Sequence, residues 1–468
     1  MSADARQARG RLDPASFRSF RFVSRELDPS GHVTLRYALD DEIAFVEELD
    51  LPVERELVQG ELDRVEGLLS LLHWVAGVSY FKVAAPPLVE FQSGPPGPAA
   101  AALLEALYSE GLGEFAFTNA LARLPRPAFT TAAAPHAATA PQAGAPTTPG
   151  MADEPALERV LVPVGGGKDS AVAIEVLRRT GLELALFSIG DAPPIARTVA
   201  VAGLPHLLVR RRLDPGLTAL NEAGALNGHV PITAIVSCVA LLTAALTGYD
   251  AVAMANERSA SSGNLTWDGI EINHQFSKGL SAERLLSAAA AETRTGVRIF
   301  SLLRPASELA IARAFARMDA YHPAFTSCNA IFRIDPALRA RSWCCECPKC
   351  RFVFLALAPF SSPDHMSAIF GRDLLAEEWQ FDGFALLTAT GGHKPFECVG
   401  EEQESLAAIR LLARDPEWSA HPVVVRLVDE VLAGHPPAAG DPDTVLALSA
   451  DHDVPATLID DVRAILGA

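Results

Sequence analysis

A glycine-rich turn near residue 165 has the composition of a phosphate-binding loop. An apolar run over residues 160–164 leads into it, and an amphipathic helix is predicted to begin directly after it. The residues of the turn are Gly165, Gly166, Gly167, Lys168, Asp169 and Ser170. Glycine allows a positive φ and brings backbone N–H groups close to a ligand, and the new helix adds unpaired amides and the positive end of its dipole. We therefore expect the turn to bind pyrophosphate, with Lys168 neutralising part of the charge; the alternative is an ordinary connection between a strand and a helix.

The spacing of this turn differs from that of two common nucleotide-binding motifs. It is not a Walker A loop, because Asp169 follows Lys168 and no earlier glycine has the required spacing. It is not the dinucleotide fingerprint, because Ser170 stands where the third glycine would be. The form Gly-Gly-Gly-x-Asp-Ser instead resembles the PP-loop of enzymes that split ATP into AMP and pyrophosphate. The resemblance implies ATP as the nucleotide.

Polar residues crowd together directly after a second apolar run, at residues 256–278. Asn256 and Glu257 have the side chains that bind magnesium or a ribose, and Arg258 and Lys278 have those that bind phosphates or carboxylates. His274 lies in the same stretch. The alternative is a solvated loop whose serines and asparagines only form turns.

A run of cysteines has the spacing of a metal site. Cys344, Cys347 and Cys350 form C-x-x-C-x-x-C, which suits a tetrahedral zinc ion bound by thiolates, and Cys328 is a plausible fourth ligand. The 7-cyano-7-deazaguanine synthases, a zinc-bearing branch of the PP-loop enzymes, have a similar pattern with glycine in place of Cys345. We therefore leave Cys345 out of the predicted site. Reduced buried thiols or a redox pair are the alternatives.

A loop at residues 391–401 contains groups that act as acid, base and nucleophile in other enzymes. His393, Lys394, Glu397 and Cys398 lie among turn-forming residues there. The alternative is a loop of a helical hairpin that holds these polar residues by chance.

Strands and helices alternate from residue 159 onward, which predicts an α/β fold with a mainly parallel, doubly wound sheet. The predicted strands cover residues 159–164, 183–188, 206–209 and 251–255, and the predicted helices cover 170–180, 196–202 and 231–246. In such sheets ligands bind beyond the carboxyl ends of the strands. Ser188, Gly190 and Asn256 follow strand ends, so we expect them to border a nucleotide held by the glycine-rich turn.

The rest of the chain predicts three further parts. Residues 1–128 indicate an α+β module that opens with a hairpin over residues 17–37 and shows no catalytic motif. Residues 129–155, rich in Ala, Pro and Thr, have the composition of a linker. Residues 156–400 form the predicted catalytic domain with the cysteine-rich site. Residues 401–468 form a helical C-terminal region, with helices expected at 405–413, 422–433 and 456–466.

Composition limits the class of protein. The formal charge of −18 over 468 residues argues against non-specific binding of nucleic acid, which needs a basic face. The N-terminus has no apolar segment of a signal peptide, and the apolar stretch 232–247 is short for a membrane span, so a buried helix is expected there. We expect a cytoplasmic enzyme with a small-molecule substrate and no membrane partner; the sequence makes no prediction of the oligomeric state.

Four segments together resemble one family. They are GGGKDS at 165–170, NERSAS at 256–261, WCCECPKCRFVF at 343–354 and KPFECVGE at 394–401. These segments are similar to those of the UDP-N-acetylmuramoyl-L-alanyl-L-glutamate epimerases of bacterial cell-wall synthesis. The resemblance implies that the terminal L-glutamate becomes D-glutamate with ATP and Mg²⁺. It further implies a carboxyl-adenylate whose α-hydrogen is acidic enough for a general base to remove, before water releases AMP.

The resemblance also implies roles for individual residues. The glycine-rich turn holds pyrophosphate, Ser188 and Gly190 border the adenosine, and Glu257 binds magnesium with Asn256 nearby. The residues expected to bind the anionic sugar nucleotide are Arg258, Lys278, Arg333 and Lys394. Cys398 is expected to transfer the proton, with His393 or His274 as its partner. Cys328, Cys344, Cys347 and Cys350 are expected to hold structural zinc.

Two other functions are compatible with parts of the pattern. One is a PP-loop amidating or thiolating enzyme of the 7-cyano-7-deazaguanine synthase type, or one acting on tRNA. The acidic charge disfavours tRNA, and the long N-terminal module disfavours the compact deazaguanine enzymes. The other is a zinc-bearing scaffold that responds to nucleotide without catalysis.

Overall fold

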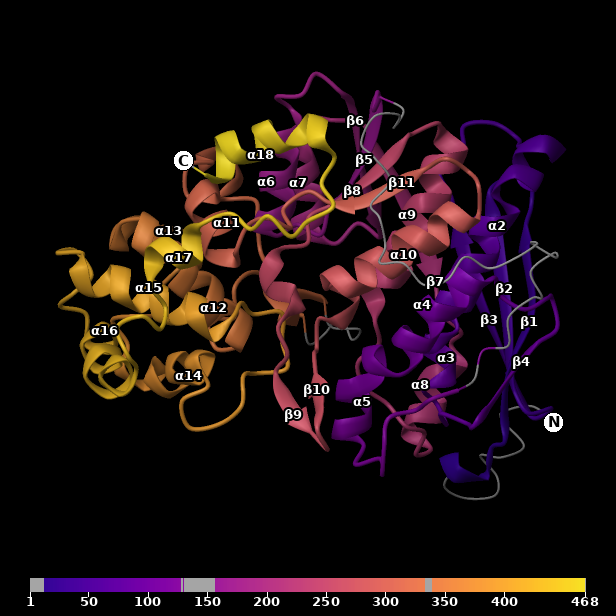
Figure 1. The fold of residues 1–468 in the computed structure, drawn as a ribbon, viewed down its shortest axis with the longest axis horizontal. Helices are drawn as coiled ribbons and strands as arrows, with labels where there is room; N and C mark the ends of the chain where they lie inside the picture. Colours follow the sequence, from indigo (N-terminus) through magenta and orange to yellow (C-terminus); the bar gives the residue numbers. More distant parts are fainter. Residues whose placement is uncertain (1–11, 128, 130–155, 333–338, 468) are drawn as a thin grey trace, which may run out of the picture.

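Short apolar runs that alternate with helices build a parallel sheet at the centre of the molecule (Figure 1). The computed structural model describes residues 12–127, 129, 156–332 and 339–467. Neighbouring strands run parallel in the order β11, β8, β5, β6, β7. Their bounds are Arg298–Ser301 (β11), Ala251–Met254 (β8), Arg159–Pro163 (β5), Glu183–Ile189 (β6) and His206–Arg212 (β7).

Alternate residues of these strands enter two different apolar cores, one on each face of the sheet. In β5, Val160 and Val162 belong to one core and Leu161 to the other. Helices α6 (Lys168–Leu177) and α11 (Glu308–Phe315) contribute to the first core, and α9 (Ile232–Thr247) and α10 (Leu280–Glu292) to the second. Successive side chains of a strand point to opposite faces, so a strand with both faces covered is apolar throughout. The expectation of an α/β fold with a large, mostly parallel sheet is confirmed.

The predicted element boundaries differ from the observed ones for local reasons. The helix expected at residues 170–180 is α6, which begins two residues earlier because Gly167, with extended backbone, is its N-cap residue. The strand expected at 206–209 continues to Arg212, because its last residues pair with a second neighbour, β3 (Ile43–Asp50).

The N-terminal strands extend the same sheet. The predicted hairpin is β1 (Ser19–Leu27) and β2 (His32–Leu39), which are antiparallel, and β2 pairs with β3. β3 then pairs antiparallel with β7, and the fully buried carboxylate of Glu47 binds Arg211 at 2.7 Å. β4 (Leu88–Phe91) closes the far edge. The N-terminal segment and the parallel strands therefore share one sheet, although the domain boundaries stay a prediction and residues 130–155 lie outside the described part.

The other helices of the N-terminal half cover this sheet or connect its strands. They are α2 (Gln59–Ala76), α3 (Val78–Phe81), α4 (Pro98–Tyr108), α5 (Gly113–Thr118), α7 (Pro193–Ala202) and α8 (Gly216–Glu222). Helix α9 packs against α2 and is largely buried, as expected for residues 232–247. Among the residues described, we find no helix with the length and apolar character needed to cross a bilayer.

The C-terminal third is mainly helical and lies at the opposite end of the molecule from β1–β4 (Figure 1). Its helices are α12 (Pro348–Leu357), α13 (Pro363–Phe370), α14 (Phe381–Ala385), α15 (Glu402–Arg414), α16 (Pro422–Arg426), α17 (Pro442–Leu446) and α18 (Ile459–Leu466). The helix expected at 422–433 begins as α16 but continues as a π-helical turn over Leu427–Val431. A short hairpin of β9 (Leu265–Trp267) and β10 (Ile270–Ile272) precedes α10.

Candidate functional site

A cavity of about 380 Å³ opens at the carboxyl ends of the parallel strands. This is where a doubly wound sheet binds ligands. Its wall combines the glycine-rich turn, the ends of β6 and β8, and segments from the C-terminal third. The polar lining residues are Asp169, Ser170, Ser188, Thr233, Asn256, Glu257, Lys278, Thr326, Ser327, Asn329, Lys349 and Cys398.

The glycine-rich turn is shaped by backbone constraints that only glycine meets. Gly166 has a φ of +82°, and a Cβ there would lie 2.6 Å from Pro194. A Cβ at Gly167 would lie 2.8 Å from the Ser327 hydroxyl, whereas Gly165 faces no atom within 4 Å. The turn leads directly into the N-terminus of α6, whose first amides have no partner within the helix. This end of the cavity can therefore hold a phosphate chain.

Lys168 does not line the cavity. Its side chain is 1% exposed, and its ammonium group forms ion pairs with Asp169 and Glu308. Burial would lower the pKa of Lys168, but the two carboxylates outweigh burial and raise it. Lys168 is thus a buried cation that holds the turn to α11, and the structure does not place it at a phosphate.

The residues predicted to border adenosine and to bind magnesium lie at the carboxyl ends of β6 and β8, which flank β5 in the sheet. The Ser188 hydroxyl donates to the carbonyl oxygen of Gly190 at 2.7 Å, which fixes the turn after β6. The Asn256 amide donates to the Ser301 hydroxyl at 3.0 Å. Glu257 is 2% exposed, and its Oε1 has no hydrogen-bond partner in the described part of the chain. A buried carboxylate oxygen of this kind fits a Mg²⁺ ion.

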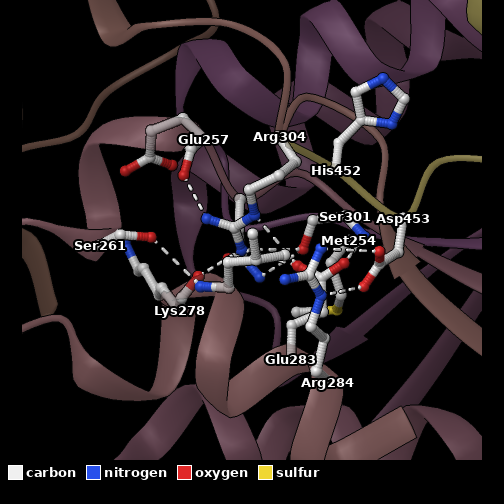
Figure 2. Close-up of polar contacts among 12 residues, drawn as sticks. Met254, Glu257, Ser261, Lys278, Glu283, Arg284, Ser301, Arg304, His452 and Asp453 are labelled. Atoms are coloured by element: carbon white, nitrogen blue, oxygen red, sulfur yellow. Dashed lines mark hydrogen bonds and ion pairs between the residues drawn. The ribbon is translucent and has the colours of Figure 1, made fainter. Parts of the chain in front are cut away.

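A buried arginine that the sequence did not single out fixes the backbone of two cavity residues (Figure 2). The Arg304 guanidinium, 1% exposed, donates to the carbonyl oxygens of Glu257 and Lys278. It also binds the Glu283 carboxylate at 2.7 Å, and that carboxylate accepts the backbone N–H of Ser301 at 2.9 Å. Arg304 therefore links the loop after β8 to the segment before α10.

Cys398 lines the cavity, and His274, which is not among the lining residues, forms a charged pair with it. Burial alone would raise the pKa of the Cys398 thiol. The positive charge of Lys278, a hydrogen bond with His274 and the positive charge of Lys349 together outweigh burial and lower the pKa to about 5. Burial would likewise lower the pKa of His274, but hydrogen bonds to Cys398 and Glu114 raise it to about 9. Between these values the pair is a thiolate and an imidazolium.

Glu114 of α5 is the third member of this group. Its carboxylate accepts a hydrogen bond from His274 Nδ1. The neighbouring imidazole of His229, with ring centroids 4.3 Å apart, has a pKa lowered to about 3 by burial and by His274, so it is neutral. The N-terminal segment, which shows no catalytic motif, thus supplies the group that orients the imidazole.

Asn264 and Gln275 hold the Cys398 loop against the His274 segment. The side-chain oxygen of Asn264 accepts the backbone N–H of His274 at 2.8 Å, and the side-chain NH₂ of Asn264 donates to the backbone carbonyl of Pro395 at 2.7 Å. The Gln275 amide donates to the Val399 carbonyl at 3.2 Å. The stretch at 256–278 is therefore a built part of the site, not a solvated loop.

The remaining predicted site residues lie elsewhere. His393 Nδ1 is 3.0 Å from the carbonyl oxygen of Lys394, and the His393 ring packs against Phe117 and Phe396. Lys394 is 2% exposed, with a pKa lowered by burial, and like His393 it is absent from the cavity wall.

Of the two predicted substrate-binding arginines, Arg258 is absent from the cavity wall. The guanidinium of Arg258 donates to the carbonyl oxygens of Val445 and Ala447, so it anchors the C-terminal segment. Arg333 lies outside the described residues.

The four predicted zinc ligands converge. The Sγ atoms of Cys328, Cys344, Cys347 and Cys350 all lie within 4.8 Å of one another. The Cys344 and Cys350 sulfurs are 3.7 Å apart, close to the roughly 3.8 Å expected for two thiolates on one tetrahedral zinc. Cys345 has a φ of +63°, the left-handed region that favours glycine, and its Sγ faces the Phe370 carbonyl at 3.4 Å. Its exclusion from the predicted ligand set therefore agrees with the geometry.

The cysteine cluster also positions part of the cavity wall. Asn329 follows Cys328, and Lys349 precedes Cys350. Both line the cavity, and the Glu397 carboxylate accepts the side-chain amide of Asn329 at 3.0 Å and the backbone N–H of Lys349 at 3.3 Å. Glu397 precedes Cys398 in the chain, so a metal bound to the cysteines would fix the loop that carries the reactive thiolate.

Comparisons with known proteins cover nearly the whole chain. The family model described as the MurL N-terminal domain matches residues 11–302, and the MurL C-terminal domain matches residues 324–440. A protein of Micromonospora sp. is 45% identical over 93% of this chain and 94% of its own length. A relative from Salinispora tropica is 46% identical over 88% of this chain and 89% of its own length. A relative from Xanthomonas oryzae pv. oryzae is 40% identical over 97% of this chain and 98% of its own length. All three are named UDP-N-acetyl-alpha-D-muramoyl-L-alanyl-L-glutamate epimerase, and none is named an amidating or thiolating enzyme.

A solved structure, a predicted subunit of tRNA methyltransferase from Methanocaldococcus jannaschii, matches 34% of this chain and 75% of its own. Its identity is 18% and its TM-score 0.23, so nothing about fold or function is drawn from it.

Proposed function

We propose that this chain, which belongs to the UDP-N-acetyl-alpha-D-muramoyl-L-alanyl-L-glutamate epimerase family, inverts the terminal glutamate of its substrate through a carboxyl-adenylate formed from ATP. It is an isomerase of peptidoglycan precursor synthesis that acts on a UDP-muramoyl dipeptide. The proposal concerns the chemical route. One observation carries it: a glycine-rich turn suited to phosphate, the unpartnered buried carboxylate of Glu257 and the Cys398 thiolate, which is paired with the His274 imidazolium, line one cavity.

The nucleotide end of the cavity activates the carboxyl group. In the proposed step, a carboxylate oxygen of the terminal glutamate attacks the α-phosphorus of ATP, and the bond to the pyrophosphate oxygen breaks. The turn at Gly165, Gly166 and Gly167, with the first amides of α6, holds the leaving pyrophosphate. Glu257, with Asn256 beside it, would hold Mg²⁺, which neutralises charge on the phosphates.

Adenylation makes the α-proton removable. Loss of that proton beside a free carboxylate would place two negative charges on adjacent atoms, and the mixed anhydride removes one of them. The Cys398 thiolate takes the proton, and water later cleaves the anhydride to release AMP. The net change is ATP and water to AMP and pyrophosphate, with the glutamyl centre inverted.

The second face of the α-carbon needs its own proton carrier. The His274 imidazole is hydrogen-bonded to the Cys398 thiolate, so both groups lie on the same side of the α-carbon of the substrate. Among the described residues, Lys278 and Lys349 are the lysines of the cavity wall, and we propose that one of them returns the proton. Both also attract the carboxylates of the substrate, which an acidic protein must do locally.

The four cysteines would hold a structural Zn²⁺ ion. The ion would cross-link the segment that contains Cys328 and Asn329 to the segment that contains Lys349 and Cys350, and it would take no part in proton transfer. Purified protein is expected to carry about one equivalent of zinc at these thiolates, which a Cys347→Ser variant loses. A variant with undiminished zinc content would remove the ion from this site.

Solvent isotope exchange tests the route directly. The protein is incubated with ATP, Mg²⁺ and the L-Glu-ended nucleotide in deuterated water, and the products are analysed by mass spectrometry and NMR. Deuterium at the glutamyl α-carbon together with AMP and pyrophosphate is the expected result. Inversion in the complete absence of nucleotide, or release of ADP, would overturn the proposal.

A further inference from the structure

A second group of metal-ligating side chains lies apart from the nucleotide cavity and the four cysteines. Asp319, His322 and His365 each offer one ligand atom, and these atoms lie within 4.8 Å of one another. His322 Nδ1 is 2.7 Å from His365 Nε2 and 3.7 Å from the Asp319 carboxylate. All three line a separate cavity of about 500 Å³, whose wall also includes Arg197 and Trp343.

His322 is held in the orientation of a metal ligand. Its Nε2 donates to the Phe315 carbonyl oxygen at 3.0 Å, so in the neutral ring Nδ1 carries the free lone pair. A hydrogen bond from the distal ring nitrogen to a carbonyl is the usual support of a metal-bound histidine. The ring is 5% exposed and packs against Phe315 and Phe325.

Two arginines, Arg197 and Arg341, lie in the wall of the same cavity. The Arg197 guanidinium donates to the Ala324 carbonyl and to the Thr326 hydroxyl. Asp319 is 87% exposed, so its carboxylate is free to approach the imidazoles. Two nitrogens on one tetrahedral zinc lie about 3.3 Å apart, so the half-buried His365 ring has only to withdraw by roughly half an ångström.

We propose that Asp319, His322 and His365 form a second transition-metal site, selective for a borderline ion such as Zn²⁺ because its ligands are two imidazoles and one carboxylate. The bound ion would join the turn after α11 to α13, next to the segment that leads into Cys344. The remaining coordination positions face the cavity.

Metal content of the full-length chain tests the proposal. The wild-type protein and a His365→Gln variant are equilibrated with excess zinc sulfate, desalted and analysed for zinc per chain. The variant is expected to hold about one equivalent less than the wild type. A matched control is His421→Gln, since His421 is also half-buried and bonds to a carboxylate, Asp373, at 3.0 Å. Equal zinc in the wild type and His365→Gln would overturn the proposal.

Cobalt substitution separates this site from the cysteines. The spectrum of the cobalt-loaded wild type minus that of His365→Gln should contain weak visible bands and no thiolate charge-transfer band, because the ligands are nitrogen and oxygen. A difference spectrum dominated by thiolate bands would assign the lost ion to the cysteines and sink the idea. Asp319→Asn, a change at an exposed side chain, should weaken zinc binding about tenfold without unfolding the protein.

Discussion

On the nucleotide side of the cavity, Gly165, Gly166 and Gly167 follow one another in a single turn. On the proton-transfer side, Glu114 and His274 are 160 residues apart along the chain, and Cys398 comes from a third segment. The first side is specified by local backbone geometry. The second exists only when helix α5, the stretch after β10 and the loop before α15 have packed together. Substitutions on the two sides should therefore fail in different ways.

The largest effect is expected on the proton-transfer side. In Cys398→Ala the base is lost, so epimerisation should fall by about 10²- to 10⁴-fold. Exchange of labelled pyrophosphate into ATP should persist, because the glycine-rich turn is untouched. His393→Gln is the control and should retain activity, since His393 packs against Phe117 and Phe396. Inversion by Cys398→Ala at the wild-type rate would remove the thiol from the chemistry.

A substitution on the nucleotide side should give the opposite pattern. Gly166→Ala introduces a Cβ 2.6 Å from Pro194 at a φ of +82°. Strain of about 1–3 kcal/mol should reduce both pyrophosphate exchange and epimerisation by about tenfold to a hundredfold. Gly165→Ala meets no atom within 4 Å and should be nearly neutral to the fold of the turn. If both variants lost exchange equally, steric shape at Gly166 would not be what the turn requires.

Arg304 tests whether the two sides depend on a common support (Figure 2). Arg304→Lys cannot reach both carbonyl oxygens and the Glu283 carboxylate, so the Mg²⁺ concentration needed for half-maximal rate should rise by about tenfold. Arg284→Lys is the matched control on α10, because Arg284 pairs with Asp451 and Asp453 near the surface. An unchanged Mg²⁺ requirement in a folded Arg304→Lys variant would show that this support is not needed.

The smallest effect is expected in the pH profile. The proposed route needs the Cys398 thiolate, so activity should rise as pH passes about 5, and it needs the His274 imidazolium, so activity should fall as pH passes about 9. Glu114→Gln removes a carboxylate that raises the pKa of His274, so the alkaline limb should move to lower pH by about one unit or more. Glu110→Gln, an exposed change nearby, should leave the limb in place.

The sequence predicted what depends on neighbours along the chain. The glycine-rich turn, the four cysteines and the β/α alternation are local patterns, and the structure places them as expected. Cys398 was predicted with His393 or His274 as its partner, and the structure pairs it with His274, whereas His393 packs against Phe117 and Phe396. Nothing local in the sequence shows that the Arg258 guanidinium meets the carbonyl oxygens of Val445 and Ala447, so the role of Arg258 in substrate binding stays a prediction.

The residues that sequence reasoning missed all act across the fold. Glu114, Arg304 and Glu283 resemble ordinary helix or loop charges until their burial and partners are known. Lys349 had a signal, since it lies inside the cysteine-rich run, but that run was interpreted only as a metal site. Lys349 lies between Cys347 and Cys350, so its position is set by the convergence of these two cysteines. That convergence places Lys349 in the cavity wall.

The pairing of β3 with β7 has a consequence for synthesis of the chain on the ribosome. Glu48 binds Arg212, a residue 164 positions later in the chain. At about 5–20 residues per second, β3 waits on the order of ten seconds for its partner to be translated. During that interval the strand presents an open edge to other nascent chains. Chaperones that shield such edges should therefore raise the yield of this enzyme more than they raise that of a protein whose sheet is completed in chain order.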